Sequence, residues 1–464
     1  MFFLVSGFIS LVQVCSLVVI ANAEVDGEID LRGVSYFSNV RGEQTLTQTP
    51  MHLFGQIKSV SDNYRKLGGW HFSGGGGITL GEFEDWFFDV PSAHYLWKTS
   101  AVSTEYAAGR KIEDWSALDS TWNMGLWQPR MRWDYLEPET IGLVGLSTKL
   151  NITKNINLFL LGSPIDVPER GPNFFLRDQI IFSNSPWFSP VPREVVIFNQ
   201  VTPVSYLVDY PALSDLLVLP NGGLKLDWIS SEETRISLAY QYKPINQVLL
   251  GYSGYFDIQG VPQVPVTVTP KRIYHHLAGL ETTQKIDSID MKVDFSYNVD
   301  SPVSQDSSDT ESIPQYQIAH ILSALFRYDF DSSSLLQGLE LSAGYLHLFG
   351  GKVHDVGGTS LGSQQGSAFE SRFWLYRAVR LGGEWKLNES FTKISGTYIR
   401  ELLVKGSILS LKIKHNIYRN FWGYVGVDLL GADIVRDEAD SRFPDFISRY
   451  RANDRVFGGL SYVF

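Results

Sequence analysis

The chain ends in Arg455-Val456-Phe457-Gly458-Gly459-Leu460-Ser461-Tyr462-Val463-Phe464, and this stretch decides the fold class. Counted back from the terminal carboxylate, every second residue is apolar or glycine. These residues are Phe464, Tyr462, Leu460, Gly458 and Val456. Side chains two residues apart point to the same face of a β-strand. The stretch therefore predicts a C-terminal strand with one apolar face.

The same alternation recurs in earlier parts of the chain, in 142–150, 235–242, 287–298 and 408–414. In 287–298, the apolar residues Ile289, Met291, Val293, Phe295 and Tyr297 alternate with Asp290, Lys292, Asp294 and Ser296. In water, the apolar face of each strand would need a second sheet over it. In a bilayer it faces lipid, while the charged face lines a wet lumen. The pattern therefore favours an all-β, antiparallel transmembrane β-barrel.

The terminal Phe on an alternating strand resembles the last strand of bacterial outer-membrane β-barrels. That resemblance implies that Tyr462 and Phe464 form an assembly signal read by the barrel-assembly machinery. It also implies contact with outer-membrane lipid and lipopolysaccharide. Taken alone, the last ten residues also fit the final strand of a soluble sandwich. The alternation along the rest of the chain favours the barrel.

Residues 1–23 carry no charged side chain and end in Ala21-Asn22-Ala23. This pattern predicts a secretory signal peptide cleaved before Glu24, with an uncleaved membrane anchor as the alternative. Residues 24–464 then form a single barrel domain. The one cysteine, Cys15, lies in the predicted signal peptide, so the mature chain has no thiol for a disulfide, a zinc site or catalysis. We expect no metal and no cofactor.

The charge balance is 39 − 50 = −11, without a basic cluster. This argues against nucleic acid as a partner.

Counting strands back from Phe464 gives about 20 strands, beginning near Asp30. The pattern is weak in 30–61 and 194–230, so the prediction is an even number of roughly 16 to 20 strands. Short polar connections are predicted at Thr282–Ile286, Lys243–Asn246, Asn388–Ser390 and His415–Asn420. Longer ones are predicted at 299–316, 350–369 and 431–450. This alternation of short and long connections predicts short periplasmic turns and long extracellular loops.

The most distinctive segment is 105–139, where a strand ending in Gly109-Arg110-Lys111 leads into a long loop. Four tryptophans lie there among Asp, Asn, Gln and Arg: Trp115, Trp122, Trp127 and Trp133. The segment loosely resembles porin-like barrels, including those of polysaccharide export and sugar uptake. The resemblance implies a loop that folds inward and narrows the pore.

The composition of this segment suits a saccharide, since indole faces stack on sugar rings and planar polar groups bind hydroxyls. We predict that eight side chains shape the constriction: Arg110, Lys111, Asp114, Trp115, Asp119, Trp122, Arg130 and Arg132. The alternative is that the tryptophans pack beneath a structured external loop. Both interpretations stay open at this point.

Two other segments have no assigned role. The proline-rich stretch 163–193 is an external lid, an inserted plug or a rigid surface loop, because so many prolines exclude an interior strand. The run Gly74–Gly77 lies in a predicted strand and lacks the helix and Lys-Ser/Thr pair of a phosphate loop. We expect it to relieve crowding in the lumen or to let a loop approach the wall.

Barrels of about 16 strands or more leave an aqueous channel. The sequence therefore predicts a passive channel for small hydrophilic solutes, saccharides or an exopolysaccharide, with oligomerisation left open. The alternatives are a surface adhesin, a structural protein or, less favoured, an outer-membrane hydrolase. No serine-centred motif accompanies any of the nine histidines. The one weak catalytic candidate places His320 and His347 together in the lumen beside Ser323 or Ser342, and we expect no enzymatic activity.

Overall fold

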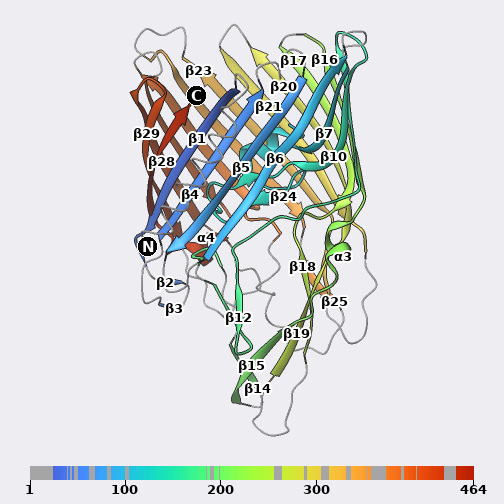
Figure 1. Cartoon of the computed structure of the whole chain (residues 1–464), viewed down its shortest axis with the longest axis vertical. Helices are drawn as coiled ribbons and strands as arrows, with labels where there is room; N and C mark the ends of the chain where they lie inside the picture. The colour runs from blue at the N-terminus through green and yellow to red at the C-terminus, as the bar shows by residue number, and fades with distance from the viewer. Residues whose placement is uncertain are drawn as a thin grey trace.

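The chain builds a closed β-barrel with a second group of strands at one end (Figure 1). A computed structural model describes residues 25–38, 40–41, 44–45, 51–61, 68–80, 85–99, 104–183, 185–188, 193–197, 199–231, 233–254, 264–286, 290–304, 313–330, 336–351, 353–356, 372–387, 391–403, 405–432 and 446–464. The predicted signal peptide lies outside the described residues.

Within the described residues, 18 strands form the barrel, each antiparallel to its neighbours. In chain order they are β1 (Val25–Tyr36), β4 (Met51–Ser61), β5 (Gly68–Leu80), β6 (Asp85–Thr99), β7 (Thr104–Lys111), β10 (Leu143–Asn151), β11 (Ile156–Ser163), β16 (Asn221–Ile229), β17 (Thr234–Pro244), β20 (Tyr274–Ile286), β21 (Met291–Pro302), β23 (Ala319–Asp329), β24 (Leu339–Gly350), β26 (Arg377–Leu387), β27 (Thr392–Glu401), β28 (Gly406–Tyr418), β29 (Phe421–Ala432) and β30 (Arg455–Val463).

The first and last strands close the barrel. β1 pairs with β30 from Glu28 opposite Val463 to Tyr36 opposite Arg455, and with β4 on its other side. Closure pairs the backbone groups of both strands, which a bilayer requires because it offers no water to unpaired groups. The predicted even strand number and the antiparallel barrel are confirmed.

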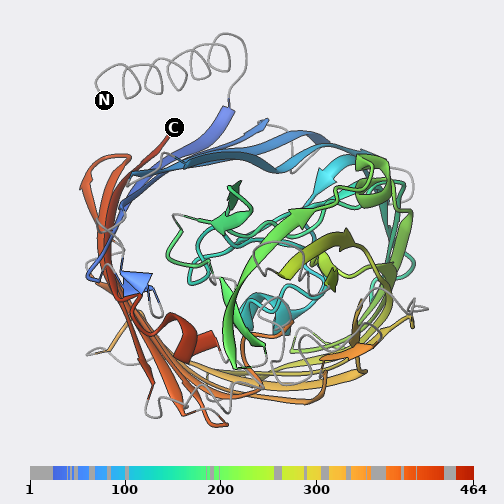
Figure 2. The same ribbon diagram turned by 90° about the horizontal axis from the view of Figure 1, so that it is seen from below.

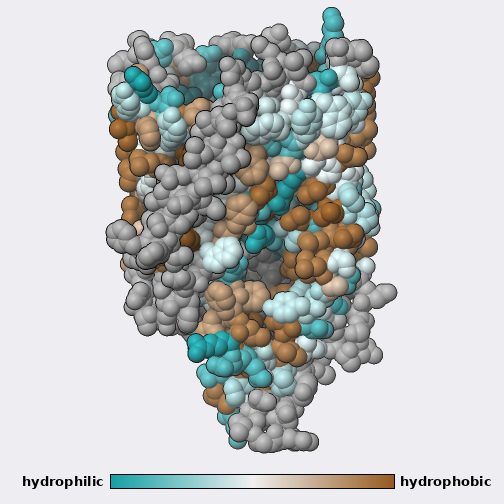
Figure 3. All heavy atoms as spheres, in the orientation of Figure 1, coloured by the Kyte–Doolittle hydropathy of each residue, from teal (hydrophilic) through white to brown (hydrophobic). Residues whose placement is uncertain are grey.

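The alternation read from the sequence separates an apolar outside from a polar inside. On β30, Leu460 (51% exposed) and Tyr462 (36% exposed) face outward, whereas Arg455 and Ser461 are buried toward the lumen. The outer surface carries broad apolar patches along the barrel wall (Figure 3). This is the arrangement of a barrel in lipid, with a polar interior.

Connections are short at one end of the barrel, and most are long at the other (Figure 1), as predicted; 81–84 and 402–405 are short connections at the long end. The predicted turns were only partly right. Thr282–Ile286 still belongs to β20, His415–Tyr418 still belongs to β28, and Lys243–Asn246 spans the end of β17 and the start of a long connection, 245–273, at the opposite end. The polar residues there suggested a turn, but β17 ends at Pro244 and the chain leaves the barrel wall. The predicted turn Asn388–Ser390 lies outside the described residues.

The long connections carry strands of their own. A four-stranded sheet projects from the barrel, formed by β14 (Glu194–Ile197), β15 (Gln200–Val208), β19 (Val264–Lys271) and β18 (Leu249–Gly254). The count back from Phe464 gave about 20 strands, more than the 18 of the barrel. In 194–230, one of the two stretches where that count was weak, β14 and β15 lie in this projection and not in the wall.

The remaining elements are short and lie in the connections. They are β2 (Val40–Arg41), β3 (Gln44–Thr45), α2 (Ala117–Trp122), β8 (Arg130–Met131), β9 (Glu139–Thr140), β12 (Phe175–Arg177), β13 (Ile180–Phe182), α3 (Leu213–Leu217), β22 (Ile313–Tyr316), β25 (Val353–Val356) and α4 (Phe446–Tyr450). In the described part of the chain, no helix has the length and apolar character needed to cross a membrane.

Candidate functional site in the barrel lumen

The connection between β7 and β10, residues 112–142, lies inside the barrel (Figure 2). Its shape comes from two polar residues. The Ser116 side chain caps α2 by accepting a hydrogen bond from the Asp119 amide. The Asp119 carboxylate then accepts hydrogen bonds from the amides of Leu126 and Trp127, at 3.0 Å each. These contacts fold the segment back on itself and give it a defined shape.

Indole groups tie this inward segment to one side of the wall. Trp122 Nε1 donates to Ser323 Oγ of β23 at 2.7 Å, and Trp127 Nε1 donates to Asn298 Oδ1 of β21 at 3.0 Å. On β20, Glu281 accepts from the Ser116 hydroxyl. The polar lumen-facing residues of these strands are therefore partners of the segment.

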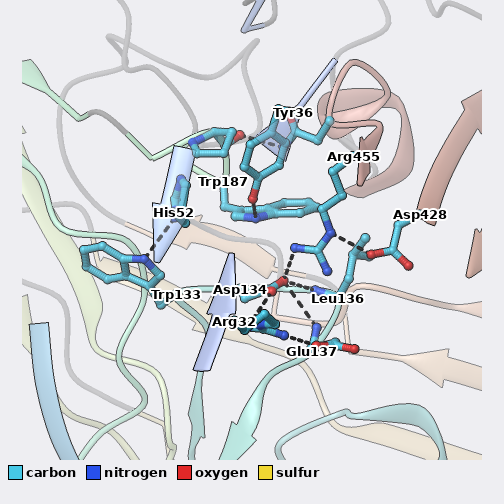
Figure 4. A network of polar contacts seen from close by, with 12 residues as sticks. Arg32, Tyr36, His52, Trp133, Asp134, Leu136, Glu137, Trp187, Asp428 and Arg455 are labelled. Atoms are coloured by element: carbon cyan, nitrogen blue, oxygen red, sulfur yellow. Dashed lines mark hydrogen bonds and ion pairs between the residues drawn. The ribbon is translucent and has the colours of Figure 1, made fainter. Parts of the chain in front are cut away.

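Asp134 ties the other part of the segment to the strands that close the barrel (Figure 4). Its carboxylate lies 2.7 Å from Arg455 Nη1 of β30 and 3.1 Å from Arg32 Nη2 of β1. Arg455 also binds Asp428 of β29, at 2.6 Å. Burial alone would raise the pKa of Asp134, but Arg455 and Arg32 outweigh it and hold the pKa below its usual value.

Part of the proline-rich stretch also reaches the interior. Trp187 is buried, donates to Tyr36 Oη at 2.8 Å and stacks on Phe446 of α4 with ring centroids 6.0 Å apart. Tyr135 of the inward segment packs on Trp187 and Tyr450. An aromatic cluster therefore joins three connections inside the barrel.

The structure brings most of the predicted constriction residues into the inward segment, with protein partners for their side chains. Trp115 stacks on Trp127, at 5.5 Å between centroids and 6° between ring planes, and is 2% exposed. Trp122 is fully buried, and the buried Asp119 holds the fold-back. The faces of these indoles are thus occupied, and their contact with a solute remains a prediction.

The cationic members of the predicted set are also engaged. Arg130 donates to the Asp119 carbonyl at 2.8 Å, and Arg132 forms a buried ion pair with Glu169. Arg110 binds Asp89 and the Val90 carbonyl. Lys111 pairs with Glu113 at 2.6 Å, and the Asp114 carbonyl accepts from Lys225. These residues hold the inward segment in place, and their contact with a solute also remains a prediction.

A cavity of about 260 Å³ lies between residues 131–139 of the inward segment and the wall formed by β1, β4, β5 and β6. Its polar lining includes residues that sequence reasoning did not single out: Arg32, Gln56, Lys58, Asp89 and Glu139. Gln56 and Lys58 alternate with outward residues of β4, so a correct strand assignment in 51–61 would have placed them in the lumen. The run Gly74–Gly77 was the other available signal.

Glu139 is the titratable group of this cavity that changes charge near neutral pH. Burial, reinforced by the negative charge of Asp89, raises its pKa to about 7 against the attraction of Lys58. Its carboxylate also accepts a hydrogen bond from Gln56. The cavity therefore loses a negative charge when the pH falls below neutrality.

The catalytic candidate built on His320 and His347 is wrong. Both histidines lie on the outer face, where His320 bonds Tyr297 Oη at 2.8 Å and His347 bonds Tyr345 Oη at 3.0 Å. Ser323 faces the lumen and binds Trp122 instead. Each serine is an odd number of positions from its histidine, so the two side chains point to opposite faces. Among the described residues, no group of three or more His, Cys, Asp or Glu is placed to hold a metal ion.

The closed antiparallel wall, the apolar outer face and the polar lumen define an outer-membrane β-barrel with a porin-like inward connection.

No family model matches the chain, and no curated protein matches it. Among solved structures, a BenF-like porin from Pseudomonas fluorescens Pf-5 is similar at 10% identity and a TM-score of 0.48, over 95% of this chain and 98% of that one. OccAB3 of Acinetobacter baumannii is similar at 10% identity and 0.47, over 95% and 99%. OccK10 (OpdN) of Pseudomonas aeruginosa is similar at 12% identity and 0.45, over 95% and 99%. Likeness at this level carries no information on the solute.

Proposed function

We propose that the protein is a passive channel through which small hydrophilic solutes, saccharides among them, cross the outer membrane. The observation that carries the proposal is the polar cavity between the inward segment and the wall of β1, β4, β5 and β6. It lies inside a barrel of 18 strands, a size at which the lumen is wide enough for water. The inward segment would narrow this lumen and select among solutes.

The size of the cavity favours small solutes. Its volume of about 260 Å³ is slightly below the roughly 300–1,000 Å³ of pockets that enclose drug-sized ligands. A single sugar ring or a similar solute suits such a space better than a polymer, so export of an exopolysaccharide is not favoured. Phe87, which is partly exposed, borders the cavity and supplies an aromatic surface on which a sugar ring can stack, whereas Trp133 is buried against it with ring centroids 4.4 Å apart.

Single-channel conductance tests the proposal. The mature protein, residues 24–464, is refolded and inserted into a planar bilayer in potassium chloride, and glucose, maltose and maltotriose are then added. We expect a stable conductance that glucose or maltose reduces in a saturable way. A refolded barrel that conducts no ions would refute the channel.

A second candidate function is adhesion through the projecting sheet. Val196 is 70% exposed, Val201 is 64% exposed and Leu207 is 61% exposed, all on β14 and β15. Apolar side chains gathered on a protruding surface favour contact with another macromolecule. Replacing all three residues by serine should lower the attachment of cells that display the protein to another cell or surface. The single-channel conductance of the barrel should stay unchanged. Equal attachment would remove this candidate.

A further inference from the structure

The glycine run of β5 thins the wall beside the cavity. Gly75 lies opposite Gln56 of β4 and Asp89 of β6, both of which face the lumen, and Gly76 lies opposite Gly55. Gly55, Gly75 and Gly76 all border the cavity. Because Gly75 carries no side chain between the lumen-facing Gln56 and Asp89, the wall at this position leaves room for the cavity.

Asp89 borders this space and has one carboxylate oxygen without a hydrogen-bond partner among the described residues. The residue is 8% exposed, and its Oδ1 accepts from Arg110 Nη1 at 3.2 Å and from the Val90 amide at 2.9 Å. Its Oδ2 is buried and has no hydrogen-bond partner in the described part of the chain. Buried carboxylate oxygens are normally paired, since leaving one unpaired forfeits its hydration. An N–H donor from a ligand would complete it.

Glu139 adds a second carboxylate to the same cavity. One of its oxygens accepts from Gln56, and its negative charge is felt by Asp89 and by Arg110. The partly exposed ring of Phe87, which packs on the buried Trp133, borders the space beside these carboxylates. Aromatic faces attract cations, so the apolar part of the lining favours the same charge as the acidic part.

The cations of the lining do not cancel this preference. Arg32 is engaged by Asp134 and Glu137, and its guanidinium lies over the Phe54 ring. Lys58 attracts Glu139, and Arg110 pairs with Asp89. The lining as a whole still holds more acidic than basic side chains, because Asp30, Asp89, Asp134, Glu137 and Glu139 face only Arg32 and Lys58. A divalent metal is a poor match, because calcium takes six to eight oxygen ligands and no such cluster lies among the described residues.

We propose that this cavity binds the protonated amine of a small organic solute, with Asp89 Oδ2 and the Glu139 carboxylate accepting its N–H groups. The proposal rests on the proposed channel, because the solute reaches the cavity through the lumen. It narrows the solute class from small hydrophilic molecules to those with a primary ammonium group.

Calorimetric binding to the refolded mature protein in detergent at pH 8 tests the site without requiring conduction. The probes are 1,4-diaminobutane, the neutral 1,4-butanediol and the dianion succinate, which share a four-carbon chain. We expect saturable binding of the diamine and no binding of the other two. Binding of the diol as tight as that of the diamine would overturn the proposal.

Two variants locate the binding. E139Q keeps the acceptor for Gln56 and removes the charge, and it should raise the Kd for the diamine about tenfold. E233Q removes an exposed carboxylate from the turn between β16 and β17 and should leave the Kd unchanged. D89N should also weaken binding, but Asp89 holds Arg110, so E139Q is the decisive variant. A wild-type Kd in E139Q would place the amine elsewhere and overturn the assignment.

Conductance separates this inference from the channel on which it rests. Conducting channels that the diamine neither binds nor blocks would overturn the amine site and leave the channel standing. Diamine binding to a barrel that conducts no ions would support the site and refute the channel. Block by the diamine that weakens in E139Q and not in E233Q would support both.

Discussion

At the scale of single residues, Asp134 is a link between parts of the chain that are far apart in sequence. It is buried, and it pairs with Arg455 of the last strand and Arg32 of the first, so one carboxylate joins the inward segment to the strands that close the barrel. Replacing Asp134 by a neutral side chain leaves Arg455 paired with Asp428 and Arg32 paired with Glu137, so the buried network loses one negative charge but no arginine is left without a partner. This places the cost at the lower end of the range for a broken buried ion pair.

We therefore expect D134N to lower the free energy of unfolding by about 3 kcal/mol, measured by urea unfolding in lipid vesicles. The depressed pKa of Asp134 means that this stabilisation is present at neutral pH and is lost as the pH falls below the usual aspartate value. D178N is the matched control, since the Arg177–Asp178 pair is exposed at 72% and 88% and should contribute little. Equal free energies of unfolding for D134N and D178N would contradict this role of Asp134.

The raised pKa of Glu139 predicts that the preference of the channel for cations over anions depends on pH. The groups around it are Gln56 and Lys58 of β4, Asp89 of β6, Arg32 of β1 and Arg110 of β7. With a pKa of about 7, Glu139 is ionised at pH 8 and protonated at pH 6, so the cavity is more negative at the higher pH. The ratio of cation to anion permeability should rise from pH 6 to pH 8, with a midpoint near 7. In E139Q this step should vanish, and a step that persists would assign the titration to another group.

At the scale of elements, α2 and the turn after it hold the inward segment against β20, β21 and β23. The predicted solute contact of Trp122 can be separated from its packing role. Because Trp122 is fully buried, W122A leaves a cavity and should cost about 3–5 kcal/mol of stability, with noisier and larger conductance as the segment loosens. W122F keeps a smaller aromatic ring and loses the hydrogen bond to Ser323, so it should cost less stability than W122A. An unchanged unfolding midpoint with altered saccharide block would instead support direct contact with the solute.

The end of β30 gives a prediction about assembly. Phe464 and Gly27 exchange two backbone hydrogen bonds of 2.9 Å, which extend the pairing of the first and last strands by one residue. Deleting Phe464 removes these bonds and the predicted assembly signal. We expect far less folded barrel in outer membranes of cells, measured by heat-modifiable migration, with near-normal refolding in detergent. Equal loss in both settings would mean that Phe464 acts on stability and not on recognition.

The strands were more predictable than the site because they depend on local pattern. The alternation around Phe295 and Leu460 fixed which face meets lipid, and the tryptophans of 105–139 pointed to an inward connection. The partners of that connection lie far along the chain: Trp122 and Ser323 are 201 residues apart, and Arg455 and Asp134 are 321 apart. Without strand register, no pattern says which lumen residues meet the segment. The sequence did not predict the cavity, because the cavity depends on the glycines of β5 and on which strands of the wall lie opposite the inward segment.

At the scale of the whole molecule, a wide barrel is narrowed by connections from several places in the chain. Residues 112–142 cross the lumen, and Trp187 and α4 join them through the aromatic cluster. The wall is complete without them, since β7 pairs directly with β10 from Lys111 opposite Leu143 to Thr104 opposite Leu150. Permeability and barrel stability are therefore separable properties of this chain.

Excising residues 112–142 and joining Lys111 to Leu143 through Asn-Gly would make the β7–β10 pair a hairpin with a favoured two-residue turn. The freed lumen residues, Glu281, Asn298 and Ser323, would meet water, so they would not become buried unpaired groups. We expect a folded barrel whose single-channel conductance rises severalfold and which neither saccharides nor 1,4-diaminobutane block. Arg455 would keep Asp428 as its partner, so closure of the barrel should survive. A folded barrel with unchanged conductance would show that another connection, such as the one carrying Trp187, limits the passage.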